Sequence, residues 1–139
     1  LRASAGDPIE IGDGVTPRGH AVEVRLYAED PERGFLPQPG LLERFRFPEA
    51  SSQFRVETGF REGDTITPHY DPLLAKVLAH GATRTDAIDR LLAGLRATEL
   101  SLRGKTGPKR TNLALLVRVL ENASFRAGDY STHLLQDLP

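Results

Sequence analysis

Residues 20–27 decide the fold: His20-Ala21-Val22-Glu23-Val24-Arg25-Leu26-Tyr27. Apolar residues alternate there with Glu23, Arg25 and Tyr27, and alternation of period two is typical of a strand that buries one face. Strand geometry then places neighbouring side chains of the same face about 7 Å apart. On composition alone, a charged face of this kind is most often an exposed, ion-paired surface that adds little stability.

Short strands are predicted on the C-terminal side of this stretch. Residues 41–47 and 54–58 have the β-branched and aromatic content of strands, and residues 65–67 follow a predicted turn. The apolar run from Leu73 to Ala79 fits either a strand or a helix. Its short length and the proline and glycine that flank it favour a buried strand.

Two helices are predicted after these strands. Thr83 and Asp86 match a capping box ahead of an apolar stripe, and a second helix begins near Thr111 or Asn112. Residues 123–139 are expected to form a short closing segment. Strands followed by helices predict an α+β fold, in which an antiparallel β-sheet in the N-terminal portion is followed by two packed α-helices.

The length of 139 residues suits one domain with its own core. Residues 1–18 are rich in glycine and proline and are predicted to be a lead-in to that domain. Residues 19–135 form the predicted domain, and residues 136–139 a tail. Because the chain contains no methionine, even at its start, we expect it to be cut from a longer polypeptide.

Composition argues against several classes of protein. The net charge of −1 favours neither a polyanion nor an acidic membrane as partner. The absence of cysteine excludes disulfides, thiolate zinc sites and cysteine nucleophiles. No apolar run approaches the roughly 20 residues that a membrane-spanning helix needs. The hydrophobic fraction of 39% and the charged fraction of 27% are instead typical of a globular protein.

Familiar catalytic motifs are missing from the sequence. Gly104-Lys105-Thr106 ends like a nucleotide-binding P-loop, but Glu99 stands where that motif needs its first glycine. The four histidines are dispersed without the spacing of metal ligands. The basic stretch 103–110 has no interleaved aromatic residues, so we interpret it as a solvated connector rather than a nucleic-acid site.

Lys76 is unusual because it interrupts the apolar run of residues 73–79. A buried ammonium group needs a partner or a polar cavity. If the run is a strand, Asp71 and Lys76 lie on opposite faces, so Lys76 has to pair with another group. A structural ion pair is the default interpretation.

Residues 19–31 and the following Gly34-Phe35-Leu36-Pro37 form a long and highly specific motif. Shorter motifs follow at Val56-Glu57-Thr58-Gly59, Glu62-Gly63-Asp64, Tyr70-Asp71-Pro72, Ala75-Lys76, Thr111-Asn112-Leu113 and Phe125-Arg126-Ala127-Gly128. Together, over about residues 18–135, they resemble the C-terminal domain of biotin carboxylases.

The resemblance implies an enzyme in two parts. An ATP-grasp portion, expected to be missing from this chain, binds ATP, Mg and bicarbonate, and biotin arrives on a carrier domain. ATP activates bicarbonate, and the carboxyl group passes to a ureido nitrogen of biotin. The chain is therefore expected to contribute the biotin-facing side of the site, to hold neither nucleotide nor metal, and to be inactive alone.

Arg25 occupies the position of the family's arginine that pairs with the ureido oxygen of biotin. A guanidinium group suits that task because it stays charged and offers a planar fork of donors to a developing oxyanion. Glu23, on the same face, is expected to orient Arg25. Tyr70 and Asp71 are expected to border the biotin entrance, and Arg55 resembles a dimer-interface residue of some relatives.

The resemblance also implies partners: the ATP-grasp portion, the biotin carboxyl carrier domain, a carboxyltransferase component and a second copy in a homodimer. The version of residues 67–72 in this chain looks more like that of acyl-CoA or urea-type carboxylases. The expected location is the cytoplasm, or the mitochondrial matrix if the source is eukaryotic. Two alternatives come from other classes: a stand-alone, non-enzymatic binding or scaffolding domain with the same fold, and a small nucleic-acid-binding β domain, which the charge disfavours.

Overall fold

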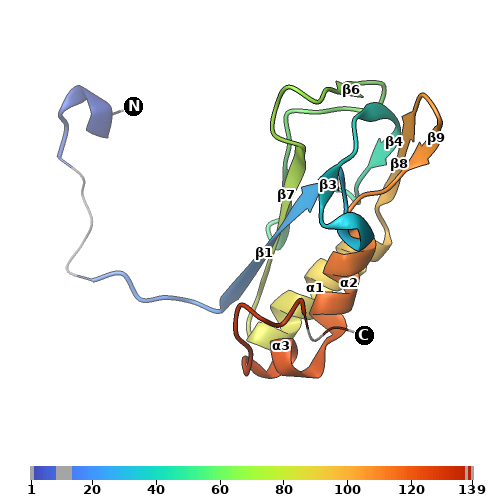
Figure 1. Ribbon diagram of the computed structural model, residues 1–139. Coiled ribbons are helices and arrows are strands. Elements are labelled where there is room, and N and C mark those ends of the chain that lie inside the picture. The colour runs from blue at the N-terminus through green and yellow to red at the C-terminus, as the bar shows by residue number, and fades with distance from the viewer. Residues whose placement is uncertain (1, 9–13, 137, 139) are drawn as a thin grey trace.

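The structure is a computed structural model that describes residues 2–8, 14–136 and 138. Residues 3–5 form one 3₁₀ turn, η1 (Ala3–Ala5). Residues 14–18 lead as extended chain into the first strand (Figure 1). Residues 9–13 of the predicted lead-in, and residues 137 and 139 of the predicted tail, lie outside the described residues.

The first sheet contains β1 (His20–Tyr27), β7 (Leu73–Gly81) and β5 (Phe54–Glu57), antiparallel in the order β1-β7-β5. The predicted strands at 20–27 and in the apolar run after Pro72 are confirmed. β7 is the central strand, and its inner face packs mainly against α1 (Arg84–Arg96). The outer face of this sheet therefore stays open to solvent.

The helix α1 begins where the sequence predicted. Thr83 Oγ1 accepts a hydrogen bond from the Asp86 N–H at 3.1 Å, and Asp86 Oδ2 accepts one from the Thr83 N–H at 3.1 Å. This reciprocal capping box satisfies two backbone donors that the first turn leaves free. The apolar stripe Ile88, Leu91 and Leu95 is fully buried beneath the sheet.

A second sheet is formed by β6 (Thr65–Ile66), β4 (Gly40–Arg46), β8 (Glu99–Gly104) and β9 (Gly107–Lys109), in that order. Leu42, Phe45 and Leu102 point from it into the common core. Between β1 and β4 in the chain lie the short paired strands β2 (Glu29–Asp30) and β3 (Leu36–Pro37), joined through the 3₁₀ turn η2 (Pro31–Arg33).

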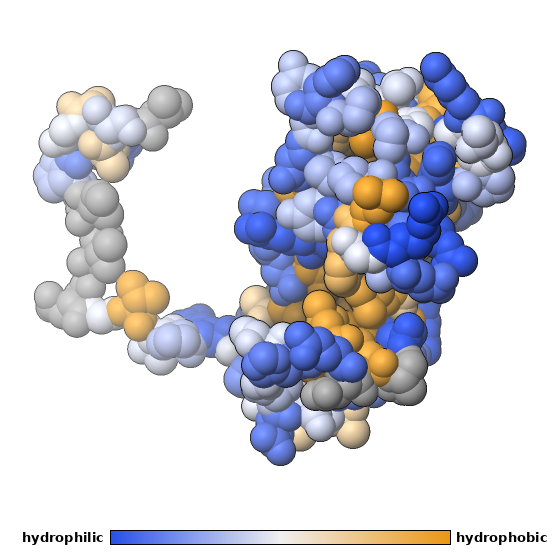
Figure 2. Space-filling view, in the orientation of Figure 1, coloured by the Kyte–Doolittle hydropathy of each residue, from blue (hydrophilic) through white to orange (hydrophobic). Residues whose placement is uncertain are grey.

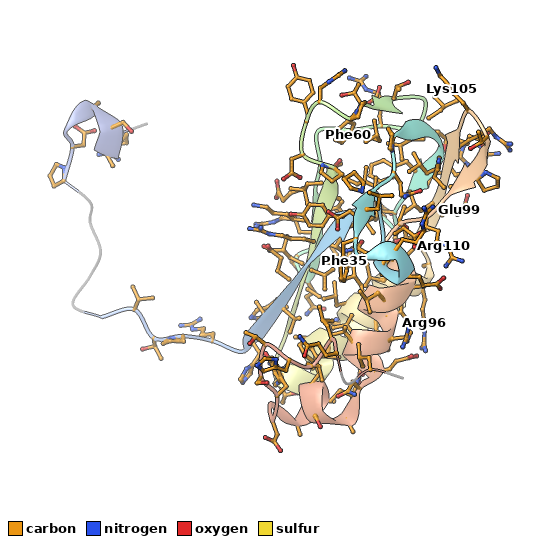
Figure 3. All side chains as sticks on the ribbon, in the orientation of Figure 1. Phe35, Phe60, Arg96, Glu99, Lys105 and Arg110 are labelled. Atoms are coloured by element: carbon orange, nitrogen blue, oxygen red, sulfur yellow. The ribbon has the colours of Figure 1, made fainter. Side chains whose placement is uncertain are left out.

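The interpretation of residues 103–110 as a solvated connector is wrong. The stretch belongs to the hairpin β8–β9, whose two-residue turn, Lys105-Thr106, is followed by Gly107 at a φ of 123°. Lys105 projects at the tip of this hairpin (Figure 3). Arg103 forms an ion pair with Glu43 of β4, so this basic residue lies on the surface of the sheet and not in a free loop.

The chain closes with α2 (Leu113–Glu121) and the short α3 (Ala123–Ala127). α2 packs against α1, and Leu120 is fully buried between them (Figure 1). The Arg84 guanidinium holds α3 in place: it lies 5.0 Å from the Phe125 ring centroid and donates to the Phe125 carbonyl at 2.7 Å. The α+β class is confirmed, although β8 and β9 lie between α1 and α2 in the chain and α3 adds a short third helix.

Candidate functional site

The outer face of the β1-β7-β5 sheet brings together the charged residues that the sequence placed on one strand face. Arg25 and Glu23 both lie exposed on β1, as the period-two pattern predicted. The register sets Arg25 directly opposite Lys76 of β7, and Lys76 directly opposite Glu57 of β5. Two cations therefore stand side by side at the centre of this face, an arrangement that is unfavourable unless an anion compensates it.

The default interpretation of Lys76 as a member of a structural ion pair finds no support within residues 2–8, 14–136 and 138. Neither Lys76 nor Arg25 has a carboxylate within 4.0 Å there. Glu57 is bound instead to Arg55, with Nε and Oε1 2.9 Å apart. Lys76 remains partly exposed, so water can solvate its ammonium group.

A shallow hollow of about 420 Å³ opens beside these charges. Glu23, Arg55, Glu57 and Lys76 supply its polar lining, and Leu78 supplies apolar surface. The hollow and Arg25 occupy the same outer face of the sheet, which makes this face a suitable place for an anionic or polar oxygen. Glu23 shares the face with Arg25, but no hydrogen bond joins the two side chains in the described part of the chain.

Tyr70 and Asp71 lie at the end of β1 that follows Arg25. The Ala28 N–H donates to the Pro72 carbonyl at 2.9 Å, which fixes residues 70–72 beside the beginning of β2. Asp71 Oδ1 accepts from the Leu73 N–H at 2.8 Å, and Tyr70 is 83% exposed. Residues 70–72, which were predicted to border the site, thus lie beside Ala28, just beyond the end of β1, and Tyr70 is directed to solvent.

Glu29 is a carboxyl group next to this segment that the sequence analysis did not single out. Partial burial raises its pKa, and the nearby Asp71 carboxylate raises the pKa further. There was little indication of this residue in the sequence, because Glu29 lies beyond the alternating pattern of residues 20–27. Burial is the larger cause of this raised pKa, and the charge of Asp71 is the smaller one.

Asn112 is the second residue that sequence reasoning missed. It is only 7% exposed, and its side chain contacts the backbone of β1 at Arg25 and Tyr27. The sequence indicated an asparagine at a helix start, which is usually explained by capping. Its contact with a strand 85 residues away could not be read from that local pattern.

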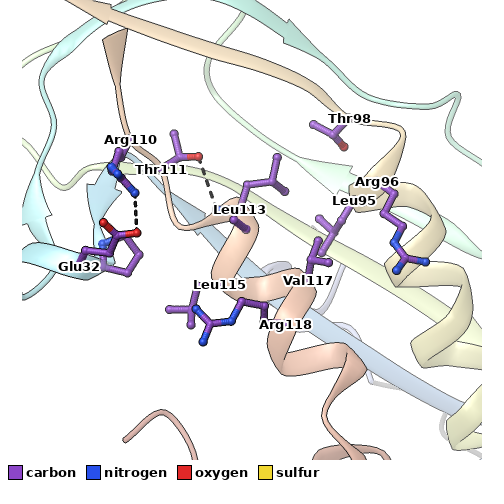
Figure 4. A pocket seen from close by; sticks show the side chains of 12 residues that line it. Glu32, Leu95, Arg96, Thr98, Arg110, Thr111, Leu113, Leu115, Val117 and Arg118 are labelled. Carbon is purple, nitrogen blue, oxygen red and sulfur yellow. Dashed lines mark hydrogen bonds and ion pairs between the residues drawn. The ribbon is translucent and has the colours of Figure 1, made fainter. Parts of the chain in front are cut away.

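Two of the other hollows in the described part of the chain lie away from Arg25. One of about 460 Å³ runs along α2 and is lined by Leu113, Leu115 and Val117, with Arg110 bound to Glu32 at its edge (Figure 4). Apolar side chains gather on this side of the molecule (Figure 2). The other, of about 690 Å³, lies between the β8–β9 hairpin and residues 65–69. In neither of these hollows do two cations lie directly opposite each other on paired strands, as Arg25 and Lys76 do.

Within the described residues, no group of three or more His, Asp or Glu side chains could hold a metal ion. No helix in that part of the chain is long and apolar enough to cross a membrane.

Comparison with known proteins identifies the class to which this fold belongs. The structure superposes on the biotin carboxylase domain of Hydrogenobacter thermophilus 2-oxoglutarate carboxylase with a TM-score of 0.88 and 31% identity, covering 98% of this chain and 29% of that one. It superposes on Kluyveromyces lactis urea carboxylase with a TM-score of 0.85 and 32% identity, covering 99% of this chain and 12% of that one. The first of these structures is a biotin carboxylase domain, and the second is a urea carboxylase.

The sequence profile described as "Biotin carboxylase C-terminal domain" matches residues 23–137. The chain belongs to this family. It is 38% identical over 137 residues to biotin carboxylase 2 of Bacillus subtilis, covering 98% of this chain and 29% of that protein. It is 34% identical to the mitochondrial methylcrotonoyl-CoA carboxylase subunit alpha of Arabidopsis thaliana, covering 98% of this chain and 18% of that one. The chain spans less than a third of the length of either relative.

Proposed function

We propose that this domain supplies the biotin-facing arginine of an enzyme that carboxylates carrier-bound biotin at the expense of ATP and bicarbonate. The observation that carries the proposal is Arg25: exposed on a sheet face, beside a second cation, and without an ion-pair partner among the described residues. Residues 19–135 form the domain, and residues 1–18 lead into it from the ATP-grasp portion. The isolated chain is inactive, because ATP and Mg bind to that other portion.

Biotin, when bound, supplies a ureido nitrogen that accepts a carboxyl group after losing its proton. A guanidinium at the ureido oxygen would stabilise the negative charge that develops there. Arg25 suits this role because it cannot release its own proton and keeps a planar fork of donors. The charge is larger in the transition state than in the ground state, so the interaction accelerates the reaction rather than only binding biotin.

Supporting roles fall to residues on the same side of the domain. Glu23 and Lys76 set the local electrostatic potential on the outer face of the sheet, and Tyr70 and Asp71 border the entrance for biotin. The proposed partners are the ATP-grasp portion, a biotin carrier domain, a carboxyltransferase component and a second copy of the enzyme in which Arg55 contributes to the contact. The proposed location is the cytoplasm, or the mitochondrial matrix of a eukaryote.

Replacement of Arg25 by alanine in the complete carboxylase tests this proposal. We expect the rate of biotin carboxylation to fall by about 10²–10³-fold, as for other oxyanion donors. Bicarbonate-dependent ATP cleavage measured without biotin should fall far less, because Arg25 acts on biotin. A variant that carboxylates biotin at nearly the parent rate would disprove the role of Arg25. Carboxylation of free biotin by the purified 139-residue chain would disprove its inactivity.

A further inference from the structure

The strand β1 is an edge strand, and one buried side chain occupies part of its free edge. In the order β1-β7-β5, β1 has a ladder partner on one side alone among the residues that the structure describes. On the other side, Asn112 Oδ1 accepts from the Tyr27 N–H at 2.8 Å, and Asn112 Nδ2 donates to the Arg25 carbonyl at 3.0 Å. The Asn112 backbone N–H donates to the Tyr27 carbonyl at 3.1 Å. Asn112 thus substitutes for a neighbouring strand over residues 25–27.

The side chain of Asn112 is used for this contact and not for its own helix. Asn112 is the N-cap residue of α2, yet its side chain makes no capping hydrogen bond. Asn122, the N-cap residue of α3, shows the ordinary behaviour: its Oδ1 accepts from the Phe125 N–H at 3.1 Å. The identity of residue 112 is therefore explained by β1, since a carboxamide carries both the acceptor for Tyr27 and the donor for Arg25.

The contact falls where β1 is least regular. The register between β1 and β7 shifts between Leu26 and Tyr27, which is a bulge or similar irregularity. Such an irregularity disrupts the ladder locally and changes the direction in which nearby side chains point. Hydrogen bonds from Asn112 on either side of Leu26 hold this segment in one conformation.

We propose that Asn112 is the positioning residue of Arg25, and that it sets the direction in which the guanidinium leaves the sheet. This inference rests on the proposed function of Arg25. No carboxylate within the described residues lies close enough to orient the guanidinium, and Lys76 opposite repels it. The backbone at residues 25–27 is thus the main structural constraint on its position. A shift of about 1 Å in a group that acts on the reacting atoms can cost about 10²-fold in rate.

Asn112→Asp in the complete carboxylase is the discriminating variant. Aspartate has nearly the same shape and is as good an N-cap residue as asparagine, so a residue that only begins a helix should tolerate it. Aspartate lacks the donor for the Arg25 carbonyl and places a second oxygen against it. We expect the ratio of biotin carboxylation to biotin-independent, bicarbonate-dependent ATP cleavage to fall by about tenfold to a hundredfold.

A second variant, Asn112→Ser, removes both side-chain bonds to β1 without burying a charge, and serine is also a good N-cap residue. The same ratio should fall in this variant, with kcat for biotin carboxylation more affected than the KM for ATP. Asn122→Asp is the matched control, because the Asn122 side chain caps α3 and, among the described residues, makes no hydrogen bond to β1. Its ratio should stay within about twofold of the parent, because aspartate is as good an N-cap residue as asparagine.

The outcomes separate this inference from the proposed function. If Arg25→Ala reduces biotin carboxylation selectively but neither Asn112 variant does, Asn112 is not a positioning residue and the assignment of Arg25 stands. If the Asn112 variants lower both activities in parallel with the unfolding temperature, Asn112 has a structural role alone and the inference is wrong. If Arg25→Ala has no selective effect, the proposed function of Arg25 and this inference fall together.

Discussion

Replacement of Gly94 by alanine should show whether tertiary packing or helix propensity has the larger effect on stability at this position. Gly94 lies inside α1, where replacement of glycine by alanine ordinarily stabilises a helix by about 1 kcal/mol. A Cβ at Gly94, however, would lie 2.1 Å from Cε2, 2.6 Å from Cζ and 2.9 Å from Cδ2 of Phe54 on β5. The ring is buried in the core, so it has no solvent into which to move.

Overpacking of a close-packed core costs about 1–3 kcal/mol, and a contact of 2.1 Å belongs to the upper part of that range. After subtraction of the gain in helix propensity, we expect Gly94→Ala to destabilise the chain by about 1–2 kcal/mol. The unfolding temperature should fall by roughly 4–8 °C. Urea and thermal unfolding followed by circular dichroism measure both quantities.

Two further variants test the reasoning. Phe54→Leu removes the two ring atoms nearest the added methyl group, so Gly94→Ala should be neutral or stabilising in that background, a coupling of about 1–2 kcal/mol. Gly59→Ala is the control, because a Cβ there meets no atom within 4 Å and the backbone does not require glycine. An unchanged or raised stability of Gly94→Ala beside the native Phe54 would refute the steric argument.

Two more predictions concern charged groups. Arg46 and the Phe45 N–H donate to the Glu62 carboxylate and lower the pKa of Glu62. The stability that the ionised carboxylate provides is therefore present at neutral pH and is lost as the pH falls through that lowered pKa. Glu62→Gln should therefore be less stable than the parent at pH 7 and converge with it in acid, as measured by urea unfolding at several pH values; a constant difference would contradict this. Arg84→Met keeps the stem but loses the charge over Phe125 and the bond to its carbonyl; it should destabilise by about 1–3 kcal/mol and expose α3 to proteolysis, whereas Arg84→Lys should be intermediate.

Local patterns predicted much of the fold because the forces behind them act over a few residues. The alternation of residues 20–27 predicted β1, and the capping box at Thr83 and Asp86 predicted the start of α1. The hairpin β8–β9 was missed because its strands are short and many of its residues are polar. The ladder between β8 and β4 stabilises this hairpin. Such a ladder depends on a partner strand more than 50 residues away, which no local window contains.

Some features of the candidate site were likewise predictable from local sequence, and others were not. Alternation alone put Glu23 and Arg25 on one face of a strand, and the motif around them indicated the family. The pairing that places Lys76 opposite Arg25 depends on the register of β7, and the contact between Asn112 and β1 depends on the packing of α2 beside an edge strand.

The sequence by itself determined the α+β class, the buried and exposed faces of β1, the start of α1 and the resemblance to biotin carboxylases. These follow from periodicity, capping and a long specific motif, all of which are properties of neighbouring residues. Only the tertiary structure decided that Lys76 has no ion-pair partner among the described residues, that residues 103–110 form a hairpin, and that Asn112 binds the backbone of Arg25. The reason is that burial, register and hydrogen bonding across 50 to 90 residues depend on the three-dimensional arrangement of elements and not on their order along the chain.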